Sequence, residues 1–219
     1  MSTEVALRIQ DIEESTDAYM GKTFLHEFAS STFYMNLSKI LNQDELEAIN
    51  PSFYDVTRDE EFINPHPFLS AINKIYQYLI ENKDVIPLVH EIGIVNNKSE
   101  TNYDWRYEYS FKYNNLSYYI NGDIMCSYSS LKDNKLIPSD LSINEFCQLY
   151  RNYFIIRYRK ENVSKLIIVK VEPIIDIANQ QFKTRTLYRY QLYETQVNDL
   201  ISICNKAISL NKDVSWAIY

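Results

Sequence analysis

The chain has 219 residues, of which 46% are hydrophobic and 23% charged, and its formal net charge is −7. These values are typical of a globular protein with a sizeable core, and the apolar runs are too short to cross a bilayer, so no membrane partner is expected. Only three glycines are present, Gly21, Gly93 and Gly122, which excludes enzymes that depend on glycine-rich phosphate loops, dinucleotide-binding fingerprints or nucleophile elbows.

The first hundred residues are predicted to be mainly helical. Thr23 is a suitable N-cap for a helix that continues to about Leu41, and residues 44–49 suggest a short further helix. A better-defined helix follows over about residues 67–80, where a proline occupies the first turn and apolar residues recur with helical spacing. The polar residues 82–84 are expected to end this helix.

Beyond this helix the hydrophobic pattern changes from a period near 3.6 to a period of 2, which indicates strands. Aromatic and polar residues alternate over residues 103–113, as expected of a long strand with one aromatic face. Asn121 and Gly122 form a pair that suits a two-residue hairpin turn, so residues 116–120 and 123–128 are expected to be antiparallel strands. The middle of the chain is therefore predicted to be an antiparallel meander.

The last part of the chain is predicted to combine helices with further strands. Ser142 and Glu145 have the spacing of a capping box, which predicts a helix start, and Thr195 is expected to cap a final helix. Strands are expected over residues 155–159, 166–171 and 185–193. We therefore expect a single α+β domain over residues 1–219, with a helical N-terminal region packed on a mostly antiparallel β-sheet and a C-terminal helix.

Cysteine and histidine are scarce and do not have the spacing of metal ligands. Cys126, Cys147 and Cys204 are far apart on apolar faces, so we expect buried free thiols in a cytoplasmic protein. The three histidines form no zinc-binding pair. We therefore expect neither a metal nor a cofactor, and because no catalytic residue can be assigned, the sequence favours a binding protein over an enzyme.

Acidic residues are concentrated at the start of the chain. Residues 1–100 contain 17 acids and 7 bases, a charge of −10, whereas residues 101–219 contain 12 acids and 15 bases, a charge of +3. An acidic, tyrosine-rich protein could bind and neutralise a basic partner protein such as a nuclease or toxin, as immunity proteins and antitoxins do. This likeness is one of overall character and has no motif behind it. The predicted partner surface consists of Tyr54, Asp55, Asp59, Glu60 and Glu61.

A second hypothesis concerns the basic residues near the C-terminal strands, since residues 151–190 contain nine bases and three acids. Arginine suits phosphate oxygens, so these strands could bind a nucleotide, a polyphosphate or RNA, in an enzyme or in a binding protein. The predicted polyanion-binding residues are Arg157, Arg159, Lys183, Arg185 and Arg189. The sequence does not decide whether these residues converge on a pocket, and we expect them to spread over an exposed sheet face.

Overall fold

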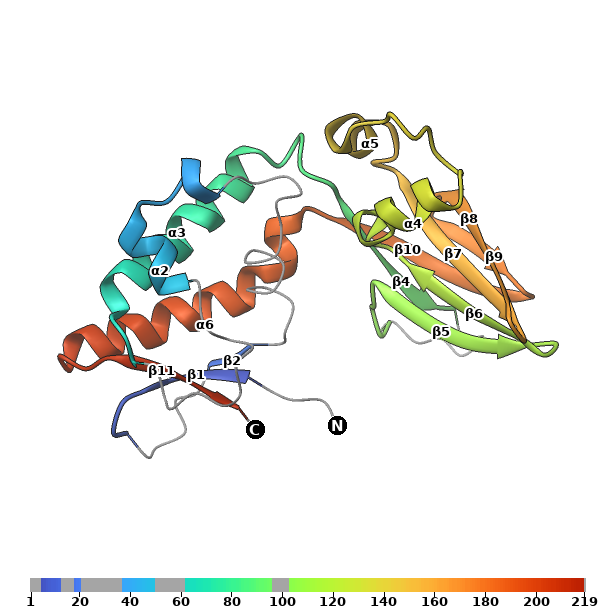
Figure 1. The fold of residues 1–219 in the computed structure, drawn as a ribbon. Coiled ribbons are helices and arrows are strands. Elements are labelled where there is room, and N and C mark those ends of the chain that lie inside the picture. Colours follow the sequence, from blue (N-terminus) through green and yellow to red (C-terminus); the bar gives the residue numbers. More distant parts are fainter. Residues whose placement is uncertain (1–4, 13–17, 21–36, 50–61, 96–102, 219) are drawn as a thin grey trace. The chain divides into compact units, whose positions relative to one another are not determined.

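The computed structural model describes residues 5–12, 18–20, 37–49, 62–95 and 103–218. The chain divides into two compact units, the first comprising Met1–Asn82 and Tyr193–Tyr219 and the second Lys83–Leu192. Both units combine helices with antiparallel strands (Figure 1), which confirms the predicted α+β class, the mostly antiparallel sheets and the C-terminal helix. The single domain expected over residues 1–219 stays a prediction.

The first unit contains a four-stranded antiparallel sheet in the order β2-β1-β11-β3. Its strands are β1 (Val5–Ile9), β2 (Ala18–Met20), β3 (Phe62–Ile63) and β11 (Val214–Ile218). Its helices are η1 (Leu37–Lys39), α2 (Gln43–Ile49), α3 (Pro65–Glu81) and the larger part of α6 (Arg189–Ser209). Because β1 pairs with β11, a strand near the N-terminus and a strand near the C-terminus form the middle of this sheet.

Helices α2 and α3 form close to where the sequence predicts them. The Asn64 side chain caps α3 by accepting a hydrogen bond from His66 N at 3.0 Å, and proline occupies the first turn. The Glu45 carboxylate of α2 accepts hydrogen bonds from Ser70 Oγ at 2.6 Å and from Lys74 Nζ at 2.8 Å, both on α3. These bonds fix the two helices to each other. Most of the helix predicted from Thr23 to Leu41 lies outside the described residues.

The second unit contains two antiparallel sheets, with strand orders β4-β10-β9 and β5-β6-β7-β8. The strands are β4 (Val89–Ile94), β5 (Glu108–Tyr113), β6 (Leu116–Asn121), β7 (Tyr153–Lys160), β8 (Val163–Lys170), β9 (Ile174–Ile177) and β10 (Gln180–Leu187). The helices are η2 (Ile124–Ser127), α4 (Tyr128–Asp133) and α5 (Ile143–Leu149). Apolar side chains from both sheets share one core, which includes Ile92, Ile120, Phe154, Ile156 and Phe182. The inner faces of the two sheets are therefore apolar, and polar side chains can occupy their outer faces.

The hairpin turn predicted at Asn121 and Gly122 is wrong. The turn that joins β5 to β6 lies at Asn114 and Asn115, whose φ angles are 47° and 60°, and asparagine tolerates this left-handed conformation better than other side chains. Gly122 has another role: a Cβ there would lie 1.6 Å from His90 O. A glycine at this position therefore allows the segment that follows β6 to pass close to the backbone of β4.

One further predicted strand is wrong and another is only partly right. Residues 123–128 form η2 and the start of α4, because the Asp123 side chain accepts a hydrogen bond from Met125 N at 3.2 Å and starts a helical turn. The strand predicted over residues 185–193 ends at Leu187, and α6 begins at Arg189, six residues before the expected cap Thr195. The capping box at α5, by contrast, is confirmed.

Candidate functional site

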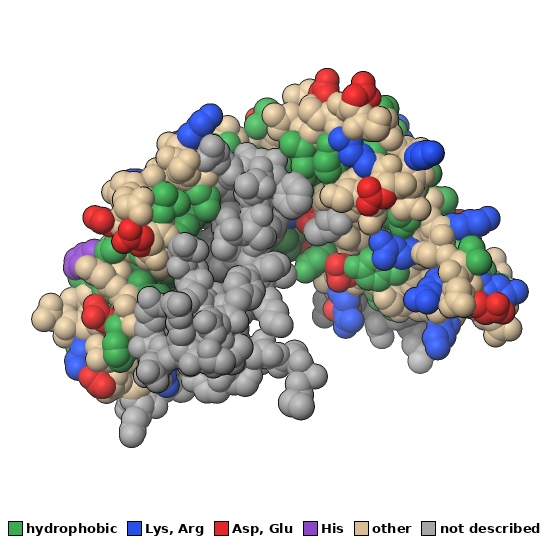
Figure 2. Space-filling view, in the orientation of Figure 1, with side chains coloured by type: hydrophobic (Ala, Val, Ile, Leu, Met, Phe, Trp, Pro, Cys, Tyr) green, Lys and Arg blue, Asp and Glu red, His purple; other side chains and the backbone are tan. Residues whose placement is uncertain are grey.

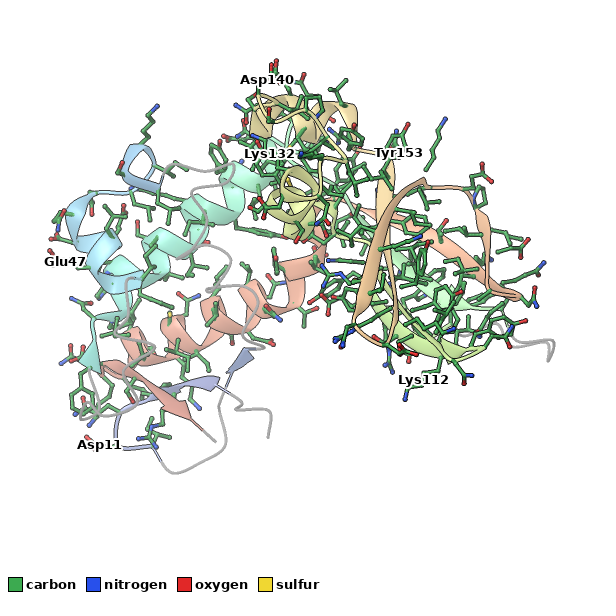
Figure 3. The ribbon with its side chains drawn as sticks, turned by 45° about the vertical axis from the view of Figure 1, so that its right-hand side comes forward. Asp11, Glu47, Lys112, Lys132, Asp140 and Tyr153 are labelled. Atoms are coloured by element: carbon green, nitrogen blue, oxygen red, sulfur yellow. The ribbon has the colours of Figure 1, made fainter. Side chains whose placement is uncertain are left out.

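The outer face of the β5-β6-β7-β8 sheet carries polar side chains. Side chains alternate along a strand, so the β5 residues Tyr109 and Phe111 pack against the core while Glu108, Ser110 and Lys112 are exposed. The alternation of half-buried aromatic and exposed polar side chains predicted over residues 103–113 is thus confirmed, although only residues 108–113 pair with β6. Lys112 extends away from the ribbon of β5 in Figure 3.

Strand register arranges this face in three cross-strand rows. The rows are Glu108 with Asn121, then Ser110 with Tyr119 and Arg157, then Lys112 with Ser117 and Arg159. Neighbouring rows are two residues and therefore about 6.6 Å apart, since a strand rises by about 3.3 Å per residue. These residues line an open groove of about 580 Å³, with Ser127 of η2 on its wall. A second hollow of about 350 Å³, lined also by Asp104 and Arg106, borders the groove at Glu108. We call the larger hollow the β5–β7 groove.

Positive charge prevails in the β5–β7 groove. Lys112, Arg157 and Arg159 line it together with a single acid, Glu108. Within the described part of the chain, Lys112 and Arg157 have no hydrogen bond or ion pair, while Arg159 Nε donates to Glu161 O at 2.9 Å. On the side drawn in Figure 2, Lys and Arg side chains gather over the strands of the second unit. The groove therefore offers cations to an anionic ligand.

Lys183 and Arg185, two other predicted polyanion-binding residues, lie on the outer face of the other sheet. The Lys183 ammonium is 4.9 Å from the centre of the Tyr103 ring. The Arg185 guanidinium is 4.6 Å from the centre of the Trp105 ring and is 2.5 Å from the Glu91 carboxylate. These cation–π and ionic contacts hold both side chains against their own sheet. The structure therefore does not bring Lys183 and Arg185 to the β5–β7 groove.

Arg189, the last of the predicted polyanion-binding residues, is buried at the start of α6. Its guanidinium forms two hydrogen bonds with the Asp123 carboxylate, Nη1 to Oδ2 at 2.6 Å and Nη2 to Oδ1 at 2.9 Å. The two side chains are 1% and 7% exposed. A buried bidentate pair of this kind has a structural role, so Arg189 is not placed to contact a ligand from solvent.

Buried thiols and a buried histidine lie elsewhere in the fold. Cys147 and Cys204 are free and buried, and burial raises the pKa of their thiols to about 11 and about 12. Such thiols stay protonated near neutral pH and are weak nucleophiles. Cys126 belongs to η2, and its side chain lies outside the description. Burial lowers the pKa of His90, whose ring nitrogens contact Thr186 Oγ1 at 3.0 Å and Arg151 O at 2.9 Å.

Metal-binding clusters and membrane-spanning helices are both absent from the described ranges. Over those ranges, no group of three or more His, Cys, Asp or Glu side chains could hold a metal ion. None of the helices described is both long and apolar enough to cross a membrane.

The predicted partner surface, Tyr54, Asp55, Asp59, Glu60 and Glu61, lies outside the described residues. The charge asymmetry of the sequence nevertheless follows the division into units. The first unit contains 17 acids and 7 bases, a charge of −10, and the second contains 12 acids and 15 bases, a charge of +3. Acidic and basic character therefore belong to different parts of the fold.

Lys112 and Tyr119 are groove residues that the sequence analysis missed. Both could have been found, because a turn at Asn114 and Asn115 fixes the β5–β6 register and places Lys112 opposite Ser117.

Comparisons with protein-family models, with curated proteins and with solved structures found no match to this chain.

Proposed function

We propose that the protein is a binding module whose β5–β7 groove holds a phosphate-bearing ligand. The observation that supports this proposal is the placement of Lys112, Arg157 and Arg159 in neighbouring rows of one open groove. Arginine guanidinium groups donate paired hydrogen bonds to phosphate oxygens, and lysine adds a compact positive charge. The groove volume of about 580 Å³ is in the range common for small-ligand sites.

Ligand-induced stabilisation tests the proposal, with inorganic tripolyphosphate and a short RNA as probes at physiological salt. A ligand at 100 times its dissociation constant stabilises the folded state by about 2.7 kcal/mol, which raises the melting temperature by several degrees. We expect this shift in the wild type and expect it to disappear in the Arg157→Ala, Arg159→Ala double variant.

A matched control removes two cations from the same sheet but outside the groove. Lys160 and Lys165 are exposed on β7 and β8 and do not line the groove. The Lys160→Ala, Lys165→Ala variant should keep the wild-type shift. An equal loss in both double variants would mean that the probe binds through overall charge, and would contradict a site in the groove.

A second candidate function is the neutralisation of a basic partner protein. The charge of −10 on the first unit favours it, since opposite charge accelerates association between proteins. The two candidates concern different units, and each can be tested without the other.

A further inference from the structure

We propose that the β5–β7 groove recognises a guanine base together with the phosphates attached to it; this inference rests on the phosphate-binding function proposed above. The two ends of the groove differ in chemistry. The row of Lys112, Ser117 and Arg159 is cationic, whereas the row of Glu108 and Asn121 offers a carboxylate and an amide. A ligand that fits both ends carries negative charge at one end and hydrogen-bond donors and acceptors at the other.

The base would bind at the end of the groove formed by the row of Glu108 and Asn121, which we call the base end. Glu108 is the hydrogen-bond acceptor at this base end. It is exposed, it lines both hollows, and among the described residues it has no hydrogen bond or ion pair. Asp104, the other acid nearby, is already paired with Arg106. A carboxylate presents two acceptor oxygens, and guanine has two adjacent donors, N1–H and N2–H, on its Watson–Crick edge. Adenine, cytosine and uracil each present one donor group there, so the carboxylate favours guanine.

Asn121 supplies a donor beside this carboxylate. It is directly opposite Glu108 in the β5–β6 pairing, so the two Cβ atoms are about 5 Å apart. Asn121 is only 4% exposed but lines the groove, and because its Oδ1 atom accepts a hydrogen bond from Asp123 N at 2.9 Å, the amide nitrogen is the atom that remains to donate to a ligand. Guanine O6 is an acceptor adjacent to N1–H. An amide donor opposite a carboxylate is therefore the pair of groups that the O6, N1 and N2 positions of guanine require.

Tyr119 and the basic residues account for the rest of the nucleotide. Tyr119 lies in the middle row, lines both hollows and is half-buried, which places an aromatic ring where a base could stack. Arg157 lies in the same row, and Lys112 and Arg159 lie in the next. From the Glu108 row to the Lys112 row the sheet extends about 13 Å, comparable with an extended guanine nucleotide. The base and the phosphates would thus occupy opposite ends of the groove.

Affinities for nucleotides that carry equal phosphates test base recognition. The full chain is titrated with GTP, ITP, ATP and tripolyphosphate under the same conditions. We expect GTP to bind roughly tenfold more tightly than ATP, and also more tightly than ITP, which lacks the 2-amino group. Tripolyphosphate should bind measurably but more weakly than GTP. Equal affinities for GTP and ATP would overturn guanine recognition alone, whereas binding of none of the four would overturn the phosphate-binding function as well.

A free nucleotide and a guanosine in single-stranded RNA present the same chemistry to this groove. Short RNAs with and without a central guanosine distinguish these sources. Tighter binding of the guanosine-containing RNA than of GTP would assign the groove to RNA, and the reverse would assign it to the free nucleotide. An RNA series without any dependence on guanosine would count against the proposal.

Variants separate base recognition from phosphate binding. Glu108→Gln should remove the preference for GTP over ATP and leave tripolyphosphate affinity within about twofold. Glu172, an exposed acid of the same unit outside the groove, gives the control Glu172→Gln, which should change neither quantity. Tyr119→Phe should retain nucleotide binding, whereas Tyr119→Leu should weaken it several-fold without weakening tripolyphosphate binding. Retention of the GTP preference in Glu108→Gln would overturn the assignment of the base end.

Discussion

At the scale of single residues, burial distinguishes cations that hold the fold from cations that could bind a ligand. Arg189 and Arg157 look alike in the sequence, yet Arg189 is 2% exposed and paired with Asp123, whereas Arg157 is exposed in the groove. A buried guanidinium needs its carboxylate, because an unpaired charge in the protein interior is costly. The ion pair between Arg189 and Asp123 therefore stabilises the second unit.

Removal of the Asp123 carboxylate should be strongly destabilising. We expect Asp123→Ala to lower the free energy of unfolding by about 3–5 kcal/mol, because Arg189 would stay buried without its partner. Asp104 pairs with Arg106 at an exposed site, so the control Asp104→Ala should lower the free energy of unfolding far less than Asp123→Ala does. Urea unfolding followed by circular dichroism measures both values, and similar small losses in the two variants would contradict a structural role for the buried pair.

His90 should make the stability of the protein depend on pH. Arg151 O can only accept a hydrogen bond, so His90 Nε2 carries the proton and Nδ1 accepts from Thr186. Burial lowers the pKa of this neutral ring below its ordinary value of 6.5. The folded state therefore binds fewer protons than the unfolded state, and the associated stability is complete above pH 6.5 and decreases as the pH falls through the lowered pKa.

Substitution isolates the contribution of His90 from those of other titrating groups. Between pH 7.5 and pH 5, the free energy of unfolding should fall more steeply in the wild type than in His90→Gln. His66 is exposed, so His66→Gln provides the control for the loss of an imidazole at the surface. The same slope in His90→Gln and in the wild type would contradict the lowered pKa.

At the scale of elements, turns and close approaches decide where strands end. The described chain adopts positive φ at eight residues other than glycine, four of which are asparagine: Asn114, Asn115, Asn179 and Asn211. None of the described glycines has a positive φ. Asparagine thus performs the turn role that glycine performs in most proteins, and Gly122 is required because of its contact with β4.

Substitutions at Asn115 and Gly122 are expected to change the free energy of unfolding in opposite directions. Asn115→Gly should raise the free energy of unfolding by about 0.5 kcal/mol, because asparagine followed by glycine is the preferred pair for this hairpin turn. Gly122→Ala should lower it by more than about 2 kcal/mol, because the new Cβ would overlap His90 O. Thermal or urea unfolding gives both signs, and a neutral Gly122→Ala would contradict the close approach of β4.

Local sequence signals predicted the elements that depend on local contacts. Helix α3 with its proline-rich start, the capping box of α5 and the strands β7 and β8 were all predicted near their observed places. The strands β1 and β11 were missed, because two short segments far apart in sequence become a sheet only by pairing with each other. Of the groove, Arg157 and Arg159 were predicted, whereas Lys112 and Tyr119 required the register of β5, β6 and β7.

At the scale of the whole molecule, the two units carry opposite charges, −10 and +3. The acids Asp59, Glu60 and Glu61 belong to the first unit, and their replacement by serine should slow association with a polylysine peptide and flatten its salt dependence. The matched control replaces three acids of the second unit, Asp133, Asp140 and Glu172, by serine. Equal slowing in both triple variants would indicate attraction by net charge and would contradict a localised partner surface.

Backbone amide NMR tests most directly whether phosphate groups bind in the β5–β7 groove. Titration of the ¹⁵N-labelled protein with tripolyphosphate should shift the amide signals of residues 108–112, 117–121 and 157–159, which contain the residues of the three rows. Signals near Lys183 and Arg185 should change little, since these two cations are already held by Tyr103, Trp105 and Glu91. Signals of the first unit should also change little, because the groove lies in the second unit. Shifts centred on β10, or spread evenly over every exposed lysine and arginine, would contradict phosphate binding in the β5–β7 groove.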